Sequence, residues 1–420
     1  MKRISLFLLL FLLLKATVMY SQDGHPETNF RIVPVSPNAA SLGTFGMIPT
    51  DNYVGQANLT IPIYEIDLDG KKFPIALSYH TDGTRVAQEA TWIGLGWTLQ
   101  AGGCVVRQVQ GTDDFAARGC YNLTDAPWLT NPRFEVTDQN LEKYMGYFKG
   151  DYDAEPDMFY FNAGGHSGSM YFDVLKNNRQ LNAVPTIQTQ EKVVKMVYNT
   201  SNKTWTMTDL EGYVYSFSTK EITYYFLNTI DFFQTDITRS HIFPYYNEPQ
   251  IVTAWMLDSV TSPNGGKITF SYKKESIFTP ISTTEDVISL SKIVNGQLSS
   301  QSPQYFTNKF NYNYSYSKIE QWTLSAITFE GGKVEFGTTD REDIESAETG
   351  KKVQKLSSIK VSDTAGNLIK TTMLEYKYLL SGMAATTNGY DDRLLLSKVY
   401  DVAGSKKNNV YTCLLYTSDA

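Results

Sequence analysis

Short runs of alternating apolar and polar residues, joined by tight turn signals, constrain the fold of this chain more than any other feature. The run at 58–66 leads to Asp69-Gly70, and a second run follows at 73–79. A two-residue Asp-Gly connection between such runs is a strong local signal for a β-hairpin. The segment 205–217 has the same form around Glu211-Gly212. The chain is therefore expected to be built of antiparallel hairpins.

The composition also favours strands. The chain contains 28 tyrosines and 22 phenylalanines among its 420 residues, and aromatic side chains suit the pleated, half-buried surface of a sheet. Long stretches with helical periodicity are nearly absent. We expect an all-β fold, in which a hairpin-rich N-terminal domain of the β-sandwich type is followed by irregular β-hairpin repeats.

The second half carries a weak internal repeat whose members share the pattern Leu-x-x-Ile/Val followed by a glycine turn. The four members begin at Leu257, Leu324, Leu356 and Leu396. After the first three turns comes a β-run that ends in aromatic residues. A hairpin of this kind cannot bury its apolar face alone, so neighbouring units must pair with it. The alternative is a set of unrelated hairpins in one large sandwich.

The first residues have the form of a secretory signal peptide. A positively charged start leads to an apolar run at 6–14 that Lys15 closes, and cleavage after Ser21 would leave Gln22 as the new N-terminus. A membrane anchor needs about 20 apolar residues, so this run is too short to span a bilayer. No later segment is long and apolar enough to cross one. We expect an exported protein that is secreted or lies on the outer cell surface.

Length and charge bound the organisation of the chain. A length of 420 residues predicts about two or three domains. We place a signal peptide at 1–21, an N-terminal β domain at 22–250, a hairpin-repeat region at 251–410 and a truncated or artefactual tail at 411–420. Signal cleavage removes three basic residues and no acid, which moves the net charge from −7 to −10. This balance disfavours nucleic acid and anionic membranes as partners, because both need clustered Lys and Arg.

Seven segments carry a resemblance to a known group of proteins. They lie at 36–46, 61–64, 74–80, 92–103, 155–161, 167–172 and 255–272. Together they resemble the N-terminal region of large exported proteins of Bacteroidetes that are similar to RHS and YD-repeat proteins. The most specific segment is 92–103, Trp-Ile-Gly-Leu-Gly-Trp-Thr-Leu-Gln-Ala-Gly-Gly. The resemblance covers most of residues 36–400, and no perfect YD-repeat consensus occurs within it.

The resemblance implies a β-built shell, or the entry domain of one, that precedes the repeats proper. In the wider family such shells enclose a C-terminal effector, often a toxin, or present an adhesive surface. No effector segment is present in these residues. The partner that the resemblance implies is therefore the remainder of a longer chain.

Two glycine-rich segments invite catalytic or cofactor interpretations that the surrounding sequence disfavours. The residues after 92–97 cannot make a good helix, which a phosphate-binding loop requires. We expect closely packed strands there, with Trp92 and Trp97 in the core. The segment 164–169 lacks the final glycine of a serine-hydrolase elbow and has strands on both sides, which favours a hairpin loop. No cofactor is expected.

Alternating acids at 151–157 are the sharpest candidate for an ion site. Asp151, Asp153, Glu155 and Asp157 would project from one side of an extended segment, where several oxygens could converge on Ca²⁺. The loop lacks the glycine and the distal glutamate of the twelve-residue calcium motif, and a solvated turn is the alternative. The four histidines show no paired spacing, so a transition-metal site lacks support.

Only three cysteines occur, so the chain is not a disulfide scaffold. Cys104 and Cys120 could form a disulfide in an oxidising compartment, but their approach cannot be read from the sequence. Two buried free thiols are the alternative.

These observations predict a non-catalytic, structural part of a large exported protein, which helps to encapsulate, display or anchor a C-terminal effector or adhesive region. The first alternative is a carbohydrate-binding surface protein, because exposed aromatic side chains stack on sugars. Its partners would be glycans or neighbouring cell surfaces. The second alternative is a glycosidase-like enzyme, although nothing selects a catalytic pair among the 44 acidic residues.

Overall fold

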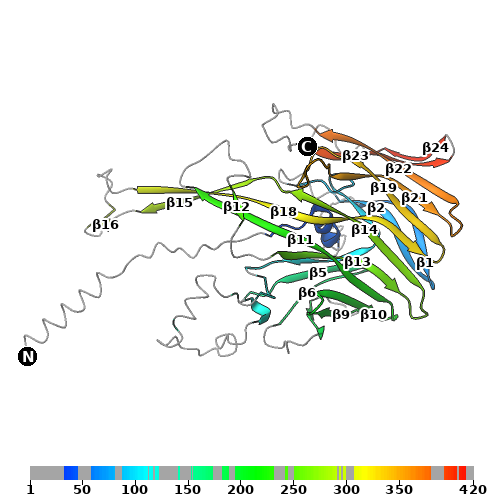
Figure 1. Ribbon diagram of the computed structural model, residues 1–420, viewed down its shortest axis with the longest axis horizontal. Coiled ribbons are helices and arrows are strands. Elements are labelled where there is room, and N and C mark those ends of the chain that lie inside the picture. Colours follow the sequence, from blue (N-terminus) through cyan, green and yellow to red (C-terminus); the bar gives the residue numbers. More distant parts are fainter. Residues whose placement is uncertain are drawn as a thin grey trace, which may run out of the picture. The chain divides into compact units, whose positions relative to one another are not determined.

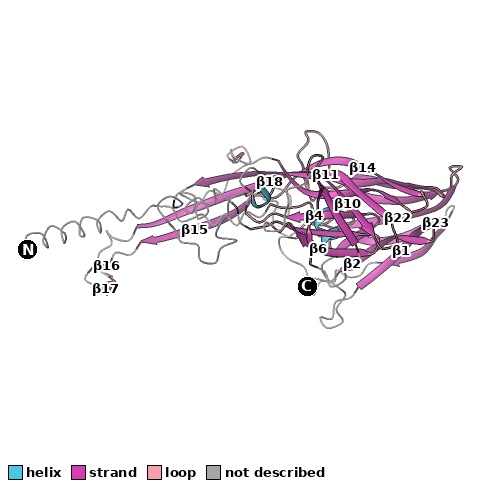
Figure 2. Ribbon diagram, turned by 90° about the horizontal axis from the view of Figure 1, so that it is seen from below, coloured by secondary structure: helices cyan, strands magenta, loops and turns pink. Residues whose placement is uncertain are grey.

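The structure is a computed structural model. It describes residues 33–45, 58–80, 88–111, 113–116, 119–122, 141, 153, 155–173, 182–188, 194–230, 242–244, 250–290, 293–294, 297–298, 307–379, 392–403 and 406–412. The signal-peptide prediction at 1–21 and nearly all of the predicted tail at 411–420 lie outside these residues. The described part consists mainly of antiparallel strands, with helix α2 (Pro37–Phe45) and the 3-10 helix η1 (Cys120–Asn122). The all-β prediction is confirmed, and Figure 2 shows how little helix accompanies the strands.

Two compact units divide the chain. Unit 1 comprises Met1–Ile32, Val109–Asp157 and Asp173–Lys176, and unit 2 comprises Val33–Gln108, Met158–Phe172 and Asn177–Ala420. Strands β1 to β24 all belong to unit 2. Neither helix in the described part has the length and apolarity of a membrane span.

A three-stranded sheet in unit 2 contains the hairpin that the Asp-Gly signal predicts. Strands β1 (Asn58–Leu68), β2 (Lys71–His80) and β3 (Trp97–Gln100) pair antiparallel in that order. Asp69 and Gly70 form the β1–β2 turn with φ values of 52° and 92°. Positive φ at both positions is the geometry of a tight hairpin turn, so this prediction is confirmed.

The remaining strands belong to a larger ladder and one small sheet. In the first half of the chain they are β4 (Gly103–Gln108), β5 (Met158–Ala163), β6 (His166–Tyr171), β7 (Asn182–Ala183), β8 (Thr186–Ile187), β9 (Val194–Asn199), β10 (Thr204–Asp209), β11 (Val214–Ile230) and β12 (Phe243–Pro244). In the second half they are β13 (Ile251–Thr261), β14 (Lys267–Phe278), β15 (Ser282–Leu290), β16 (Ile293–Val294), β17 (Gln297–Leu298), β18 (Thr307–Phe329), β19 (Gly332–Asp340), β20 (Glu345–Ser346), β21 (Gln354–Ser362), β22 (Leu368–Leu379), β23 (Arg393–Ala403) and β24 (Lys406–Thr412). Strands β16 and β17 form the small sheet.

The ladder is centred on β11 and β13, which pair with each other antiparallel. From β13 it continues through β4, β5 and β6, and from β11 through β10 and β9. In the other direction it runs from β14 through β18, β19, β21, β22 and β23 to β24, in sequence order from green to red in Figure 1. The domain boundary at residue 250 stays a prediction, although β11 and β13 pair across it.

The four predicted repeat members are the first strands of four hairpins. These hairpins are β13–β14, β18–β19, β21–β22 and β23–β24. The leucine of each member and the Ile or Val three positions later are both buried, with at most 6% of any of these side chains exposed. Side chains of a regular strand alternate between its two faces, so positions three apart would face opposite ways. A further feature must therefore bring both apolar residues to the core.

That feature is a β-bulge at the same position of every member. The residue after the leucine is skipped in the pairing with the preceding strand, and the four skipped residues are Asp258, Ser325, Ser357 and Ser397. One extra residue shifts the alternation, so that both apolar residues reach one face. The hydroxyls of Ser325 and Ser397 also donate to carbonyls of the preceding strand, those of Ser271 and Glu375, at 2.9 Å each. This recurrence favours the repeat interpretation over unrelated hairpins.

A tyrosine contact closes two of the four hairpins in the same way. The hydroxyl of Tyr272 on β14 donates to the carbonyl of Leu257 at 2.6 Å, and that of Tyr376 on β22 donates to the carbonyl of Leu356 at 2.5 Å. In both hairpins, a tyrosine on the second strand thus donates a hydrogen bond to the backbone of the leucine that begins the repeat member on the first strand. Tyr272 and Tyr376, the aromatic residues at the ends of two predicted β-runs, therefore hold the two strands of their hairpins together.

Aromatic side chains also fill the core of the ladder. Trp205 and Trp255 are each at most 1% exposed and their rings meet edge-on, with centroids 6.1 Å apart. Phe159 packs against both of them, at 5.3 and 6.1 Å. Core packing therefore accounts for these large aromatic groups, as the composition predicts.

Candidate functional site: a buried clasp at residues 90–97

The most specific sequence segment begins in a loop that lies between two of the hairpin units. We call residues 90–97 the clasp loop. Its Trp92 carbonyl accepts a hydrogen bond from the Leu356 N–H of β21 at 2.9 Å, and its Leu95 N–H donates to the Leu394 carbonyl of β23 at 2.8 Å. The loop thereby joins the opening strands of the third and fourth units.

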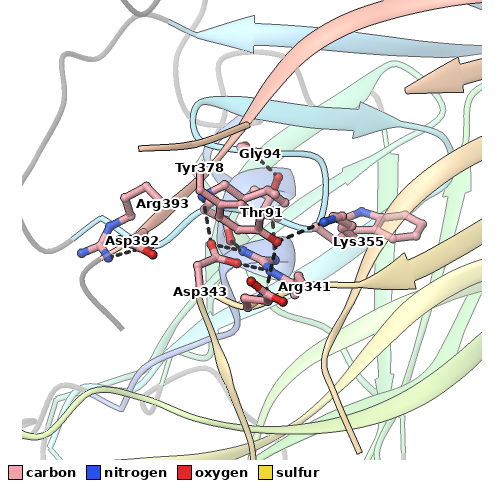
Figure 3. A network of polar contacts seen from close by, with 12 residues as sticks. Thr91, Gly94, Arg341, Asp343, Lys355, Tyr378, Asp392 and Arg393 are labelled. Carbon is pink, nitrogen blue, oxygen red and sulfur yellow. Dashed lines mark hydrogen bonds and ion pairs between the residues drawn. The ribbon is translucent and has the colours of Figure 1, made fainter. Parts of the chain in front are cut away.

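A buried ion pair holds the clasp loop from one side, as Figure 3 shows. Arg341 and Asp343 have side chains only 2% and 1% exposed, and their closest nitrogen and oxygen lie 2.7 Å apart. A second contact, from Arg341 Nε to the other carboxylate oxygen, measures 2.8 Å. This two-point geometry is the strongest form of an ion pair between these groups.

The same two side chains reach the backbone of two other segments. Arg341 Nη1 donates to the Thr91 carbonyl and Nη2 to the Ala90 carbonyl, both at 3.1 Å. The Asp343 carboxylate accepts the N–H of Leu394 at 3.0 Å. Burying two charges is costly unless each is paired and hydrogen-bonded, and here both conditions hold. The pair therefore fixes the clasp loop, the 341–343 segment and β23 to one another.

A second arginine and an acid extend the network at its edge. Arg393 Nε donates to the Gln88 carbonyl at 2.9 Å. Burial raises the pKa of Glu89, and the positive charges of Arg341 and Arg393 oppose this rise. The charged groups at this end of the loop, Glu89, Arg341, Arg393 and Asp343, thus interact with one another electrostatically.

The clasp loop itself is shaped by glycine and tryptophan. Gly94 has a φ of 116°, and a Cβ at this position would lie 2.8 Å from the Leu396 nitrogen of β23. Trp97 is fully buried beside Tyr79, with ring centroids 5.2 Å apart, and Trp92 is 6% exposed. The prediction that both tryptophans lie in the core is confirmed. The predicted strand is wrong at 92–96, where the positive φ values of Gly94 and Gly96 turn the backbone into a loop, and β3 begins only at Trp97.

The arrangement can hold segments together, because its charges are buried and paired and its polar backbone groups are bonded. Thr91 adds to this by donating its hydroxyl to the Trp97 carbonyl at 2.6 Å, which closes the loop on itself. The Trp92 N–H donates to the Asn38 side chain at 2.9 Å and so connects the loop to helix α2.

The predicted ion-site residues lie in unit 1, where their carboxylates bind backbone groups. Asp157 is fully buried and accepts the N–H groups of Gln110 and Asp114 at 2.7 and 3.2 Å. In return the Asp114 carboxylate accepts the Asp157 N–H at 3.0 Å. Asp153 is buried and accepts the Glu155 N–H at 2.9 Å.

Asp151 lies outside the described residues, and Glu155 is exposed. Within the part of the chain that the structure describes, no group of three acidic, histidine or cysteine side chains is assembled for a metal ion. The calcium site therefore stays a prediction, and the geometry shown is that of a reciprocal backbone clamp.

Cys104 and Cys120 do not form a disulfide with each other. Cys104 in unit 2 and Cys120 in unit 1 are both buried free thiols. Burial raises the pKa of each thiol, which makes both poor nucleophiles. The segment 164–169 forms the β5–β6 hairpin around Gly164 and Gly165, so the hairpin prediction there is confirmed.

A second buried carboxylate near this hairpin was not predicted. The Asp209 side chain is 1% exposed and lies 2.6 Å from Lys71 Nζ. Burial acts to raise the pKa of Asp209, but the hydrogen bonds from Lys71, Tyr213 and Tyr215 outweigh it and lower that pKa. His166 lies 3.7 Å from the same carboxylate. The site stabilises a charge and ties β2 to β10.

Comparisons with known proteins give only a distant likeness in fold. No protein family and no curated protein matches the chain. Similar solved structures include TcdB2–TccC3 (10% identity, TM-score 0.39, 91% of this chain and 16% of that chain) and its complex with Cdc42 (10%, 0.38, 85% and 15%). The Photorhabdus luminescens Tc holotoxin pore with a TccC3 mutation is another (10%, 0.39, 91% and 16%). At TM-scores below 0.5 this likeness carries no argument about function.

Proposed function

We propose that this chain is a non-catalytic structural part of a longer, exported RHS-like protein, in which it begins a β-built shell. The remainder of that longer chain would be its partner, and the shell would enclose, display or anchor an effector or adhesive region. The signal-peptide pattern at 1–21 supports export, and the segment resemblance supports the RHS-like class.

One observation carries the proposal. The second strand of each hairpin unit pairs with the first strand of the next unit, as β14 with β18, β19 with β21 and β22 with β23. In each of these strand pairs the β-bulge lies directly after the leucine of the Leu-x-x-Ile/Val pattern. Units that pair strand to strand with the next unit build an extended wall, in the manner of repeat proteins. The clasp loop supports the same role, because it fixes the segment before the wall to two of its units.

A glycan array with the recombinant mature chain tests this proposal against its main alternative. Because Trp205 and Trp255 lie in the core of the ladder and the half-buried Trp322 packs against an apolar cluster, we expect no specific, saturable binding to any glycan. Saturable binding that one surface aromatic substitution abolishes would favour a carbohydrate-binding protein instead. Hydrolysis of glycosides that a single carboxylate substitution abolishes would favour an enzyme.

A further inference from the structure

The N-terminal end of the described chain is docked on the ladder through one buried carboxylate. Glu221 on β11 is fully buried, and it accepts the Ser36 N–H at 2.8 Å and the Thr253 hydroxyl at 3.2 Å. The Ser36 hydroxyl also bonds to this carboxylate and accepts the Ala39 N–H at 3.1 Å. Ser36 is therefore the cap of helix α2 and the anchor of the segment 33–45 at once.

Among the described residues, no positive charge pairs with Glu221. Helix α2 packs through Ala39 against Cys104, Ala254 and Met256 in an apolar cluster, and residues 33–45 contain no charged side chain. Among the interactions of the described residues, Glu221 makes no ion pair. Its hydrogen-bond donors are neutral hydroxyl and amide groups.

The elements around Glu221 carry several titratable groups, which include Cys104 on β4, Glu320 and Lys318 on β18, Lys274 and Glu275 on β14, and Lys220 beside it on β11. Cys104 on β4 faces it, and burial together with the Glu221 charge raises the pKa of that thiol. On β18, Glu320 is held by Lys274 at 2.7 Å and by Lys318 at 3.9 Å. Thr253 on β13 is uncharged. In the part of the chain that the structure describes, the groups that shift the pKa of Glu221 are the uncharged Ser36 and Thr253.

Burial raises the pKa of Glu221 to about 7, and the hydrogen bonds from Ser36 and Thr253 only partly oppose this. A carboxyl group in water has a pKa of about 4.3. The docked state therefore binds the proton more tightly than an undocked state in which water reaches the group. Because proton binding and docking are linked, docking is strongest below the pKa of the undocked carboxyl group, about 4.3. It weakens as the pH rises from there through the docked pKa of about 7.

We propose that residues 33–45 are a proton-controlled latch, which stays docked while Glu221 carries a proton and is released when Glu221 ionises. Release would free the contact between Asn38 and the Trp92 N–H. It would also free the bond that the Thr223 hydroxyl donates to the Pro34 carbonyl at 3.0 Å. The latch thereby couples the protonation of Glu221 to the hydrogen bond between Asn38 and the clasp loop.

Hydrogen exchange of the mature chain, followed by mass spectrometry between pH 5.5 and 8.5, tests the latch. After correction for intrinsic chemical exchange, peptides covering 33–45 are expected to exchange faster as the pH rises, by at most about 30-fold. Docking weakens about tenfold for each pH unit, and only the interval from pH 5.5 to the docked pKa of about 7 lies within this range. In Glu221→Gln, which is neutral at every pH, these peptides should stay protected throughout.

Glu275→Gln is the matched control. Burial raises the pKa of Glu275 to about 7 as well, but its carboxylate bonds to Gln321 at 3.3 Å and reaches the segment 33–45 only indirectly, through the 3.5 Å contact between Asn38 and Gln321. Its peptides at 33–45 should keep the wild-type pH dependence. If Glu221→Gln does not fold, Thr253→Val removes a donor that lowers the Glu221 pKa, so exchange at 33–45 should go on rising to higher pH than in the wild type.

Two results would overturn the latch. One is corrected exchange at 33–45 that does not change with pH in the wild-type chain. The other is a Glu221→Gln profile that follows the wild type.

Discussion

Replacing Arg341 with methionine is expected to destabilise the mature chain by about 3–5 kcal/mol, the usual cost of removing one partner of a buried ion pair. The substitution leaves the Asp343 carboxylate buried with a single backbone donor, Leu394 N–H, from the contacts described above. It also removes the donors to the carbonyls of Ala90 and Thr91. The free energy of unfolding in urea measures the effect.

A surface ion pair provides the control. Lys333 lies 2.5 Å from Glu335, and the two side chains are 44% and 52% exposed. Lys333→Met should cost at most about 1 kcal/mol, because exposed pairs contribute little. The double variant Arg341→Met with Asp343→Leu should be more stable than Arg341→Met alone, since no charge then remains buried. A loss as small in Arg341→Met as in Lys333→Met would show that the clasp does not hold these segments together.

Gly94→Ala is expected to destabilise the chain by about 3 kcal/mol or more, from two causes that act together. The φ of 116° is unfavourable for any residue with a Cβ, and the new Cβ would lie 2.8 Å from the Leu396 nitrogen. That nitrogen belongs to the backbone of β23, which is fixed on both sides by the bond from Leu95 and by the pairing with β22. Thermal and urea unfolding of the variant measure the loss.

Gly70→Ala separates the two causes. Gly70 has a similar φ of 92°, but a Cβ there would meet nothing within 4 Å. Gly70→Ala should therefore lower the free energy of unfolding only by the cost of a positive φ in a residue with a Cβ, about 1–2 kcal/mol. Equal losses in the two variants would mean that the close approach of the clasp loop to β23 is not needed.

The local features of the fold could be predicted from the sequence, because they depend on neighbouring residues. The Asp69-Gly70 turn and the turns at Gly265, Gly332 and Gly366 specify hairpins through backbone conformation alone, with a positive φ at each of these residues. The Leu-x-x-Ile/Val pattern also held the signal for the bulge. Two apolar residues three apart in a strand cannot both face the core unless one residue is added between them.

The buried charges could not be predicted, because their partners are distant in sequence. Arg341 contacts Thr91 across 250 residues, and Ser36 contacts Glu221 across 185. An isolated acid such as Glu221 looks like a surface residue until the fold covers it. The alternation of Arg341 and Asp343 was the only local hint of a pair, since both would project from one side of an extended segment.

The complete reading frame beyond residue 412 tests the central claim most directly, and long-read sequencing of the source DNA provides it. We expect further members of the Leu-x-x-Ile/Val pattern, each followed by a glycine turn and a β-run, and then a distinct C-terminal segment. A natural stop codon directly after the fourth hairpin unit would contradict the claim that this chain begins a longer wall of hairpins.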